Sequence, residues 1–186
     1  RVLTLLFSKM NQNFVKVNEN ILDITLDLRY ASKNNFTKQK LYFSNFCYLH
    51  KVAFEHLSKS VEISKKLGLK IKIFDAYRPA VVQKKLWDFL PDKNFIAPPT
   101  KGSPHSRGVA IDLTLTRDGK DLDMGTEFDE FSPLSYHGNR QISELSFKNR
   151  LLLLGIMTDA GWDFFRNEWW HYQLFNSKAY PIIDDI

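Results

Sequence analysis

The sequence predicts an α+β fold in which helices flank a small antiparallel or mixed β-sheet. Strand-like and helix-like segments follow one another without the repeated βαβ order that builds a parallel sheet. Hydrophobic residues make up 44% and aromatic residues 14% of the chain, enough for a folded core. The length of 186 residues suits one domain. We expect residues 1–13 to be an N-terminal extension and residues 14–186 to form that domain.

The first half of the chain supplies short strands and one long helix. Residues 14–30 are predicted to form short extended pieces, because apolar and polar residues alternate near their end. Residues 31–43 have the composition of a loop. A helix is predicted over residues 44–66, where apolar residues recur at steps of three and four and Gly68 follows as a stop. The apolar residues with this spacing are Leu49, Val52, Ala53, Leu57, Ile63 and Leu67.

The central segments alternate between strand and helix. Residues 70–74 alternate polar and apolar side chains, which predicts a half-buried strand. A second helix is predicted from Pro79 to about Leu90, since proline suits the first turn. Residues 91–104 contain four prolines and form a long loop, and loops of that length are often functional. Residues 109–115 predict a strand whose polar face, opposite the core, carries Asp112.

The last third of the chain completes the sheet. Residues 117–143 show no regular period and are predicted to be irregular. A third helix is predicted over residues 144–160, ended by Gly161. Residues 169–175 form the last predicted strand.

Composition excludes several classes of function. The net charge is +5, but the basic residues are scattered, whereas a nucleic-acid binder gathers them on one stripe, so we expect no nucleic-acid partner. The single cysteine, Cys47, excludes an intrachain disulfide and is interpreted as a small buried hydrophobe. No segment approaches the roughly 18 consecutive apolar residues of a membrane-spanning helix, so we expect no transmembrane segment.

Two segments together have the composition of a catalytic zinc site. The first carries His105 and Asp112, and the second carries Glu168 and His171. A catalytic zinc ion takes three protein ligands and leaves the fourth position to water, and a nearby carboxylate can accept the proton of that water. His105 lies an odd number of residues before Asp112, so we place it in the loop before the strand. By the same reasoning Glu168 occupies the turn that enters the last strand.

Each of these residues also has a structural interpretation. A histidine beside aromatic residues is more often a hydrogen-bonded core residue than a ligand, and an aspartate on a strand can be a hydrogen-bond anchor. Arg78 can pair structurally with Asp75, or it can stabilise the charge that develops on a carbonyl oxygen. The two histidine-containing patterns rarely coincide by chance, which favours the metal site. The remaining histidines, His50, His56 and His137, are interpreted as non-ligands.

Collinear motifs give the chain a resemblance to a known family. They are DLRYA (27–31), NNFT (34–37), DAYRP (75–79), SPHSRGVAIDLTL (103–115), MGTEFD (124–129), NR (149–150) and EWWHY (168–172). With these motifs, the sequence from about Phe14 to Pro181 resembles the D-alanyl-D-alanine dipeptidases, the VanX-like zinc peptidases of bacteria. The resemblance implies the small α+β fold shared with D,D-carboxypeptidases and the hedgehog signalling domain.

The resemblance also implies the roles of individual residues. His105, Asp112 and His171 would bind one zinc ion, Glu168 would act as general base and then acid, and Arg78 would stabilise the tetrahedral intermediate. The positions that match the substrate-binding residues of the family are Tyr30, Tyr42, Ser103 and Asp129. The chain departs from the family at Lys38, where glycine is usual after the NNFT motif.

The implied function is zinc-dependent hydrolysis of D-alanyl-D-alanine, in cell-wall precursor turnover or in glycopeptide resistance. Two alternatives remain open: a D,D-carboxypeptidase that acts on longer peptidoglycan peptides, and a zinc-stabilised binding module without catalysis. The retention of Glu168 and Arg78 argues against the binding module, since a structural zinc needs neither. The resemblance places the protein in the cytoplasm or periplasm of a bacterium, with the cytoplasm favoured.

Overall fold

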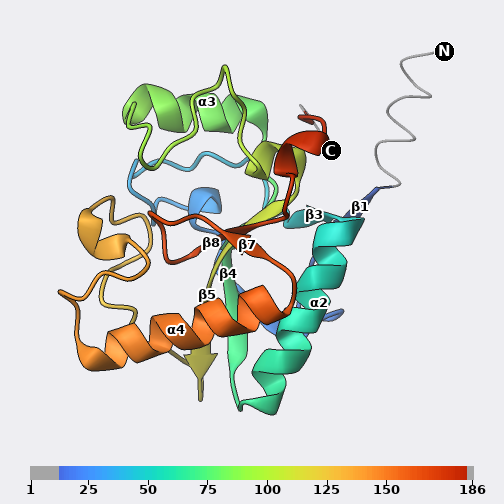
Figure 1. Ribbon diagram of the computed structural model, residues 1–186. Helices are drawn as coiled ribbons and strands as arrows, with labels where there is room; N and C mark the ends of the chain where they lie inside the picture. The colour runs from blue at the N-terminus through green and yellow to red at the C-terminus, as the bar shows by residue number, and fades with distance from the viewer. Residues whose placement is uncertain (1–12, 184–186) are drawn as a thin grey trace.

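The main sheet is mixed, as the sequence predicts. The computed structural model describes residues 13–183 (Figure 1). The sheet order is β2 (Ile24–Leu26), β4 (Lys70–Asp75), β5 (Ala110–Arg117), β8 (His171–Gln173) and β7 (Asp163–Phe164), and the short β6 (Lys120–Asp121) pairs with β5. Strands β2 and β4 run parallel, and the other neighbouring pairs of this described sheet are antiparallel.

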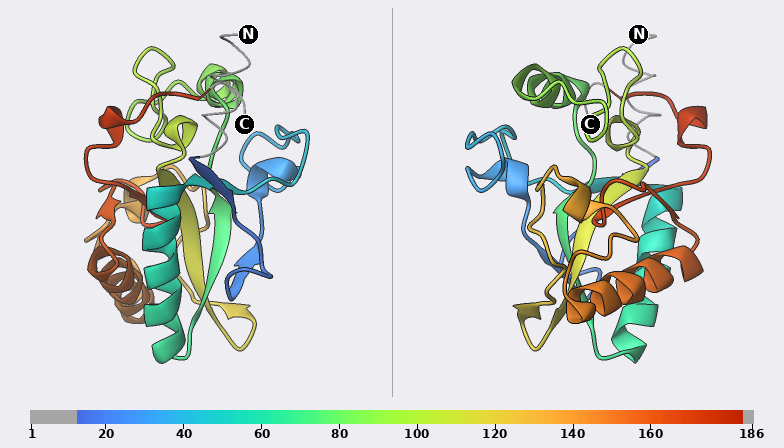
Figure 2. Two further views of the ribbon diagram at one scale, coloured as in Figure 1. Left: turned by 90° about the vertical axis from the view of Figure 1, so that its right-hand side faces the viewer. Right: turned by 60° about the vertical axis from the view of Figure 1, so that its left-hand side comes forward.

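Two long helices cover one face of this sheet. Helices α2 (Lys51–Lys66) and α4 (Glu144–Asp159) pack against each other beside β4 and β5 (Figure 2, left). Their buried side chains, such as Leu57 and Leu153, join Ile73 of β4 in the core. Burial of apolar area, at about 25 cal/mol per Å², lets this layer stabilise the fold. Helix α3 (Ala80–Phe89) lies beyond one end of the sheet (Figure 1).

The opposite face of β5 is covered as well. Residues 110–116 are all buried, including Asp112, which is only 2% exposed. The sequence correctly separates Asp112 from the helix-covered face, but the second face is not open to water. It is filled by charged and aromatic side chains from η1 (Arg29–Ala31), from the loop before β5 and from residues 123–136.

The predicted start of the long helix is wrong. Residues 44–47 are irregular, and β3 (Tyr48–His50) pairs antiparallel with β1 (Phe14–Lys16) in a separate two-stranded sheet. The helix begins at Lys51, where the ring Nδ1 of His50 accepts a hydrogen bond from the backbone N–H of Val52 at 3.3 Å. The apolar spacing of residues 49–53 continues across this boundary, so periodicity alone does not reveal the strand.

The other elements lie close to their predicted positions. Helices α3 and α4 match within one residue, and residues 91–104 contain no helix or strand. After Arg117, the last residue of β5, residues 118–143 hold only β6 and the short η3 (Pro133–Ser135). The last strand is shorter than predicted, because Trp169 and Trp170 lie in the turn before it. The proposed extension lies outside the described residues except for Asn13. Between residues 13 and 183, no helix has the length and hydropathy needed to cross a membrane.

Candidate active site

The register of three strands aligns the polar centre of the site. Asp75 of β4 is the cross-strand partner of Asp112 of β5, and Asp112 is the partner of His171 of β8. Directly opposed residues on neighbouring strands project to the same face of the sheet, about 5 Å apart. A row of one histidine and two carboxylates therefore forms on the face opposite α2 and α4.

His105 reaches this row from the 3₁₀ turn η2 (His105–Arg107), just before β5. The turn ends at Gly108, whose φ is +68° and where an added Cβ would lie 2.2 Å from a ring carbon of Phe14. Only glycine fits that combination of backbone and space. The chain therefore turns tightly enough for His105 to face Asp112, as the odd spacing predicts.

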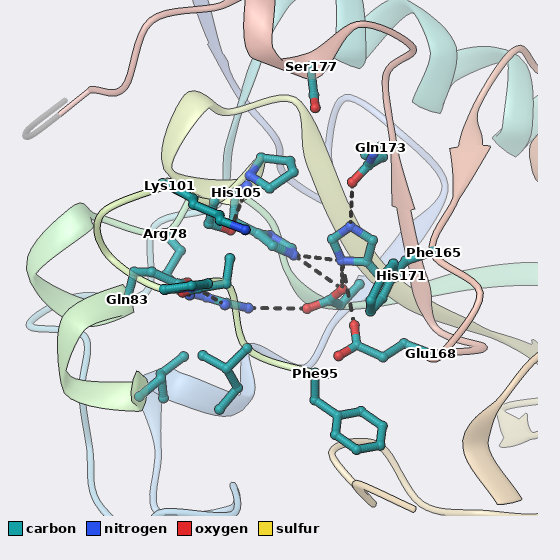
Figure 3. Close-up of a pocket in the computed structure, with 18 of the residues that line it drawn as sticks. Arg78, Gln83, Phe95, Lys101, His105, Phe165, Glu168, His171, Gln173 and Ser177 are labelled. Atoms are coloured by element: carbon teal, nitrogen blue, oxygen red, sulfur yellow. Dashed lines mark hydrogen bonds and ion pairs between the residues drawn. The ribbon is translucent and has the colours of Figure 1, made fainter. Parts of the chain in front are cut away.

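The donor atoms of His105, Asp112 and His171 converge on one point (Figure 3). His105 Nε2 lies 3.1 Å from His171 Nδ1 and 3.3 Å from Asp112 Oδ1, and His171 Nδ1 lies 3.1 Å from Asp112 Oδ1. A tetrahedral zinc ion with ligands at about 2.0–2.1 Å separates its ligand atoms by about 3.3–3.4 Å. The three residues therefore fit a zinc ion with little rearrangement.

The surroundings favour a cation at this point. The outer nitrogen of His105, Nδ1, is 2.7 Å from the carbonyl oxygen of Ala76, which leaves Nε2 free to face inward. Burial alone would raise the pKa of Asp112, but His105 and His171 lower it well below its usual range. Asp112 therefore offers an ionised, buried oxygen atom between two imidazoles, a set that suits zinc.

Glu168 lies beside the cluster without joining it. It sits in the turn before β8, and its Oε2 is 3.8 Å from His171 Nδ1. Burial raises the pKa of Glu168 well above its usual range, and the negative charges of Asp112 and Asp129 add to this effect. A buried carboxyl group with a raised pKa, next to a metal site, has the properties of a general base and acid.

Arg78 is both structurally paired and directed at the site. Its guanidinium donates to Asp75 Oδ2 at 2.8 Å, to Gln83 Oε1 at 2.9 Å and to Asp112 Oδ2 at 3.3 Å. The guanidinium also stacks over the ring of Tyr30 at 5.0 Å. Burial alone would lower the pKa of Arg78, but the negative charge of Asp75, together with the other neighbouring acidic groups, outweighs burial and raises the pKa well above its usual range. The side chain therefore stays charged. The structural and the functional interpretations of Arg78 are therefore compatible.

The cluster opens into a pocket of about 360 Å³. Three of the four residues predicted to hold the substrate line it: Tyr30, Ser103 and Asp129. The Tyr30 hydroxyl donates to Asp129 Oδ2 at 3.0 Å, which places the two beside each other as expected. Burial raises the pKa of Asp129, and the charge of Asp112 raises it further.

The fourth predicted residue, Tyr42, lies behind the pocket. Its hydroxyl donates to Asp75 Oδ1 at 2.5 Å, and it is not among the pocket-lining residues. Tyr42 thus acts on Arg78 through Asp75. The histidines interpreted as non-ligands lie elsewhere: His50 caps α2, His56 packs on Trp162, and His137 packs on Phe164 and Tyr172.

Sequence reasoning missed two glutamines that touch the site. Gln83 of α3 orients Arg78, and Gln173 of β8 lies 3.1 Å from the outer nitrogen of His171. Gln173 follows His171 by two residues, so the period of a strand could have placed it on the same face. Gln83 carries no comparable signal in the sequence.

Comparisons with known proteins confirm the resemblance drawn from the motifs. A family model described as D-ala-D-ala dipeptidase matches residues 10–184. The D-alanyl-D-alanine dipeptidase of Escherichia coli (strain K12) is 42% identical over 164 residues, covering 88% of this chain and 85% of that protein. The dipeptidase of Enterococcus faecium is 32% identical over 194 residues, covering 92% and 96%.

A solved structure shares the fold at lower identity. The LdcB LD-carboxypeptidase superposes with a TM-score of 0.54 at 17% identity, covering 90% of this chain and 70% of that one. At this identity the similarity concerns the fold alone. The family match, by contrast, spans nearly the whole chain, including every residue of the candidate site. The chain therefore belongs to the D-ala-D-ala dipeptidase family of peptidases.

Proposed function

We propose that this protein is a zinc-dependent dipeptidase that hydrolyses D-alanyl-D-alanine to D-alanine. The observation that carries the proposal is the convergence of His105, Asp112 and His171 beside Glu168 and Arg78 in one pocket. The names of the similar bacterial proteins, all D-alanyl-D-alanine dipeptidases, support the choice of substrate.

One zinc ion per chain would be held by the three converging side chains. When bound, zinc polarises the scissile carbonyl and makes water acidic enough to ionise near neutral pH. The protein would supply two imidazoles and one carboxylate, the donor set typical of a catalytic zinc site.

Glu168 moves the protons in this mechanism. Its carboxylate accepts a proton as water adds to the carbonyl carbon of the peptide bond. The same proton then passes from Glu168 to the leaving nitrogen as the C–N bond breaks, so two molecules of D-alanine are released. The proximity of Glu168 to His171, at 3.8 Å, supports this double role.

Arg78 stabilises the negative charge that develops on the carbonyl oxygen. Its guanidinium is fixed by Asp75 and Gln83, so little reorganisation is needed when the charge appears. Tyr42 contributes indirectly, since it holds the other oxygen of Asp75.

The charges of the pocket suit a free dipeptide, which carries an ammonium and a carboxylate. Asp129, with Tyr30 beside it, offers a negative charge to the ammonium. Ser103 lines the pocket with Lys93, Lys101 and Lys178, and these lysines form no ion pair with any residue between 13 and 183. Such unpaired cations can attract the substrate carboxylate. A carboxypeptidase has no need for a carboxylate that meets a terminal ammonium.

The release of D-alanine from D-alanyl-D-alanine tests the proposal. Purified protein should hydrolyse the dipeptide, lose activity when a chelator removes the metal, and regain it with stoichiometric zinc. The Cys47→Ser variant, at a position that does not line the pocket, is a control for thiol-bound metal. Full zinc loading without hydrolysis of any D,D-peptide would favour the binding module instead.

A further inference from the structure

Gln173 contacts the metal-binding histidine on the side away from the metal. The side-chain oxygen Oε1 of Gln173 lies 3.1 Å from His171 Nε2, and Figure 3 shows the two side chains end to end. The other nitrogen of His171, Nδ1, is the one that faces His105 and Asp112. His171 is thus held between the metal cluster and a single amide.

The two states of the site need different protons on His171. A neutral imidazole carries one proton, and only the nitrogen without it can bind a metal. With a cation in the cluster, Nδ1 must be bare and Nε2 must carry the proton. Without a cation, Nδ1 lies 3.1 Å from Asp112 Oδ1, and a proton on Nδ1 makes this contact a hydrogen bond and leaves Nε2 as an acceptor.

A carboxamide can satisfy both states. Its oxygen accepts from Nε2–H, and after a half-turn its NH₂ group donates to a bare Nε2. A carboxylate in the same place could only accept, and an apolar side chain could do neither. In the described residues Gln173 has no second hydrogen-bond partner that would prevent the half-turn.

We propose that Gln173 is a positioning residue that supports His171 in both tautomers and thereby strengthens metal binding. The inference rests on the proposed metal site and adds a residue to it. Partners of metal-binding histidines typically change metal affinity by 10–100-fold when they are removed.

Zinc affinity of the metal-free protein, measured by competition with a chromophoric chelator, tests this role. Gln173→Met should weaken zinc binding by about 10–100-fold, because Nε2–H loses its acceptor. Gln173→Glu should bind zinc at least as tightly as the native protein. Gln39→Met, at an exposed position, is the matched control and should leave the affinity unchanged.

Nitrogen-15 spectra of the histidine ring supply a second measurement. In the metal-free native protein His171 should carry its proton on Nδ1, and zinc binding should leave the proton on Nε2. Native zinc affinity in Gln173→Met, together with loss of zinc in His171→Ala, would overturn the role of Gln173 and leave the metal site standing. Retention of zinc in His171→Ala would overturn both.

Discussion

The proposed metal-binding side and the proposed substrate-binding side of the pocket are built from different kinds of structure. Asp112 and His171 lie on adjacent strands whose register sets the distance between them. Tyr30 lies in a 3₁₀ turn, and Asp129 lies in an irregular segment with a φ of +62°. An aspartate in that conformation stores strain of order 1–3 kcal/mol, which the surrounding structure must compensate.

A buried arginine holds the irregular segment in place. Arg150 of α4 donates to the carbonyl oxygens of Met124 at 2.6 Å and Leu134 at 2.8 Å, on either side of Asp129. Trp169 donates to Thr126 Oγ1 at 2.8 Å and so ties the same segment to the turn that carries Glu168. Side-chain hydrogen bonds here do what backbone pairing does for Asp112 and His171.

The comparison implies that the two sides of the pocket depend on different interactions. Backbone pairing between strands tolerates small changes in sequence, so substitutions elsewhere should leave the proposed metal site intact. The substrate-binding side depends on a few side chains and can be altered without disturbing the metal. Substitutions on the two sides should therefore have separable effects.

Glu168→Gln should give the largest effect, because it removes the proton carrier and keeps the shape. We expect kcat to fall by roughly 10²–10⁴-fold while zinc content and fold are retained. Steady-state kinetics and elemental analysis measure these quantities. The exposed Glu55→Gln is the matched control. Loss of metal from a folded Glu168→Gln protein would show that Glu168 is a ligand.

Arg78→Ala should lower kcat by about 10²–10³-fold and change KM less, since its charge matters most when the oxyanion forms. Arg78→Lys should recover only part of the rate, because lysine lacks the planar fork that meets Asp75 and Gln83 together. Steady-state kinetics of both variants at saturating zinc measure kcat and KM. A raised KM as the sole defect would instead assign Arg78 to binding the substrate carboxylate.

Arg150→Lys should weaken the substrate-binding side through the fold. Arg150 reaches Met124 and Leu134 with separate nitrogens of its planar guanidinium, and the single ammonium of lysine lacks that span, so we expect the free energy of unfolding to fall by about 2–4 kcal/mol. Urea denaturation measures this loss, with the exposed Arg166→Lys as control. The comparison also predicts a raised KM with zinc affinity near the native value. Weaker zinc binding in this variant would show that the two sides are not separable.

Lys38→Gly should give the smallest effect. Lys38 adopts a φ of +57°, a conformation that glycine takes without the cost of roughly 1–2 kcal/mol borne by other residues. Because glycine also gains freedom in the unfolded chain, the net gain in stability should be below about 1 kcal/mol. Thermal unfolding measures it, and a clear loss of stability would contradict this explanation.

The sequence predicts the clustering of His105, Asp112 and His171 better than the pocket around them. His105 and Asp112 belong to one turn and strand, and His171 follows Glu168 by three residues, so local spacing was informative. The family's usual glycine at position 38 also has a local explanation, because the backbone of Lys38 is left-handed. These features depend on residues near one another in the chain.

Features that depend on distant contacts were not predictable. The place of Tyr42 behind Asp75 depends on how the loop over residues 31–43 packs, and the contact of Gln83 with Arg78 depends on where α3 lies. The start of α2 was missed because β3 exists only through its pairing with β1. No local pattern carries that information.

The relative rate of hydrolysis of short and long substrates tests the central claim most directly. Because Asp129 is placed to meet a free ammonium, D-alanyl-D-alanine should be cleaved at least about 10²-fold better, in kcat/KM, than its N-acetyl form or a wall pentapeptide. In Asp129→Ala this preference should shrink while zinc content stays native, through loss of activity on the free dipeptide. Comparable rates on the dipeptide and the pentapeptide would contradict the account and identify a carboxypeptidase.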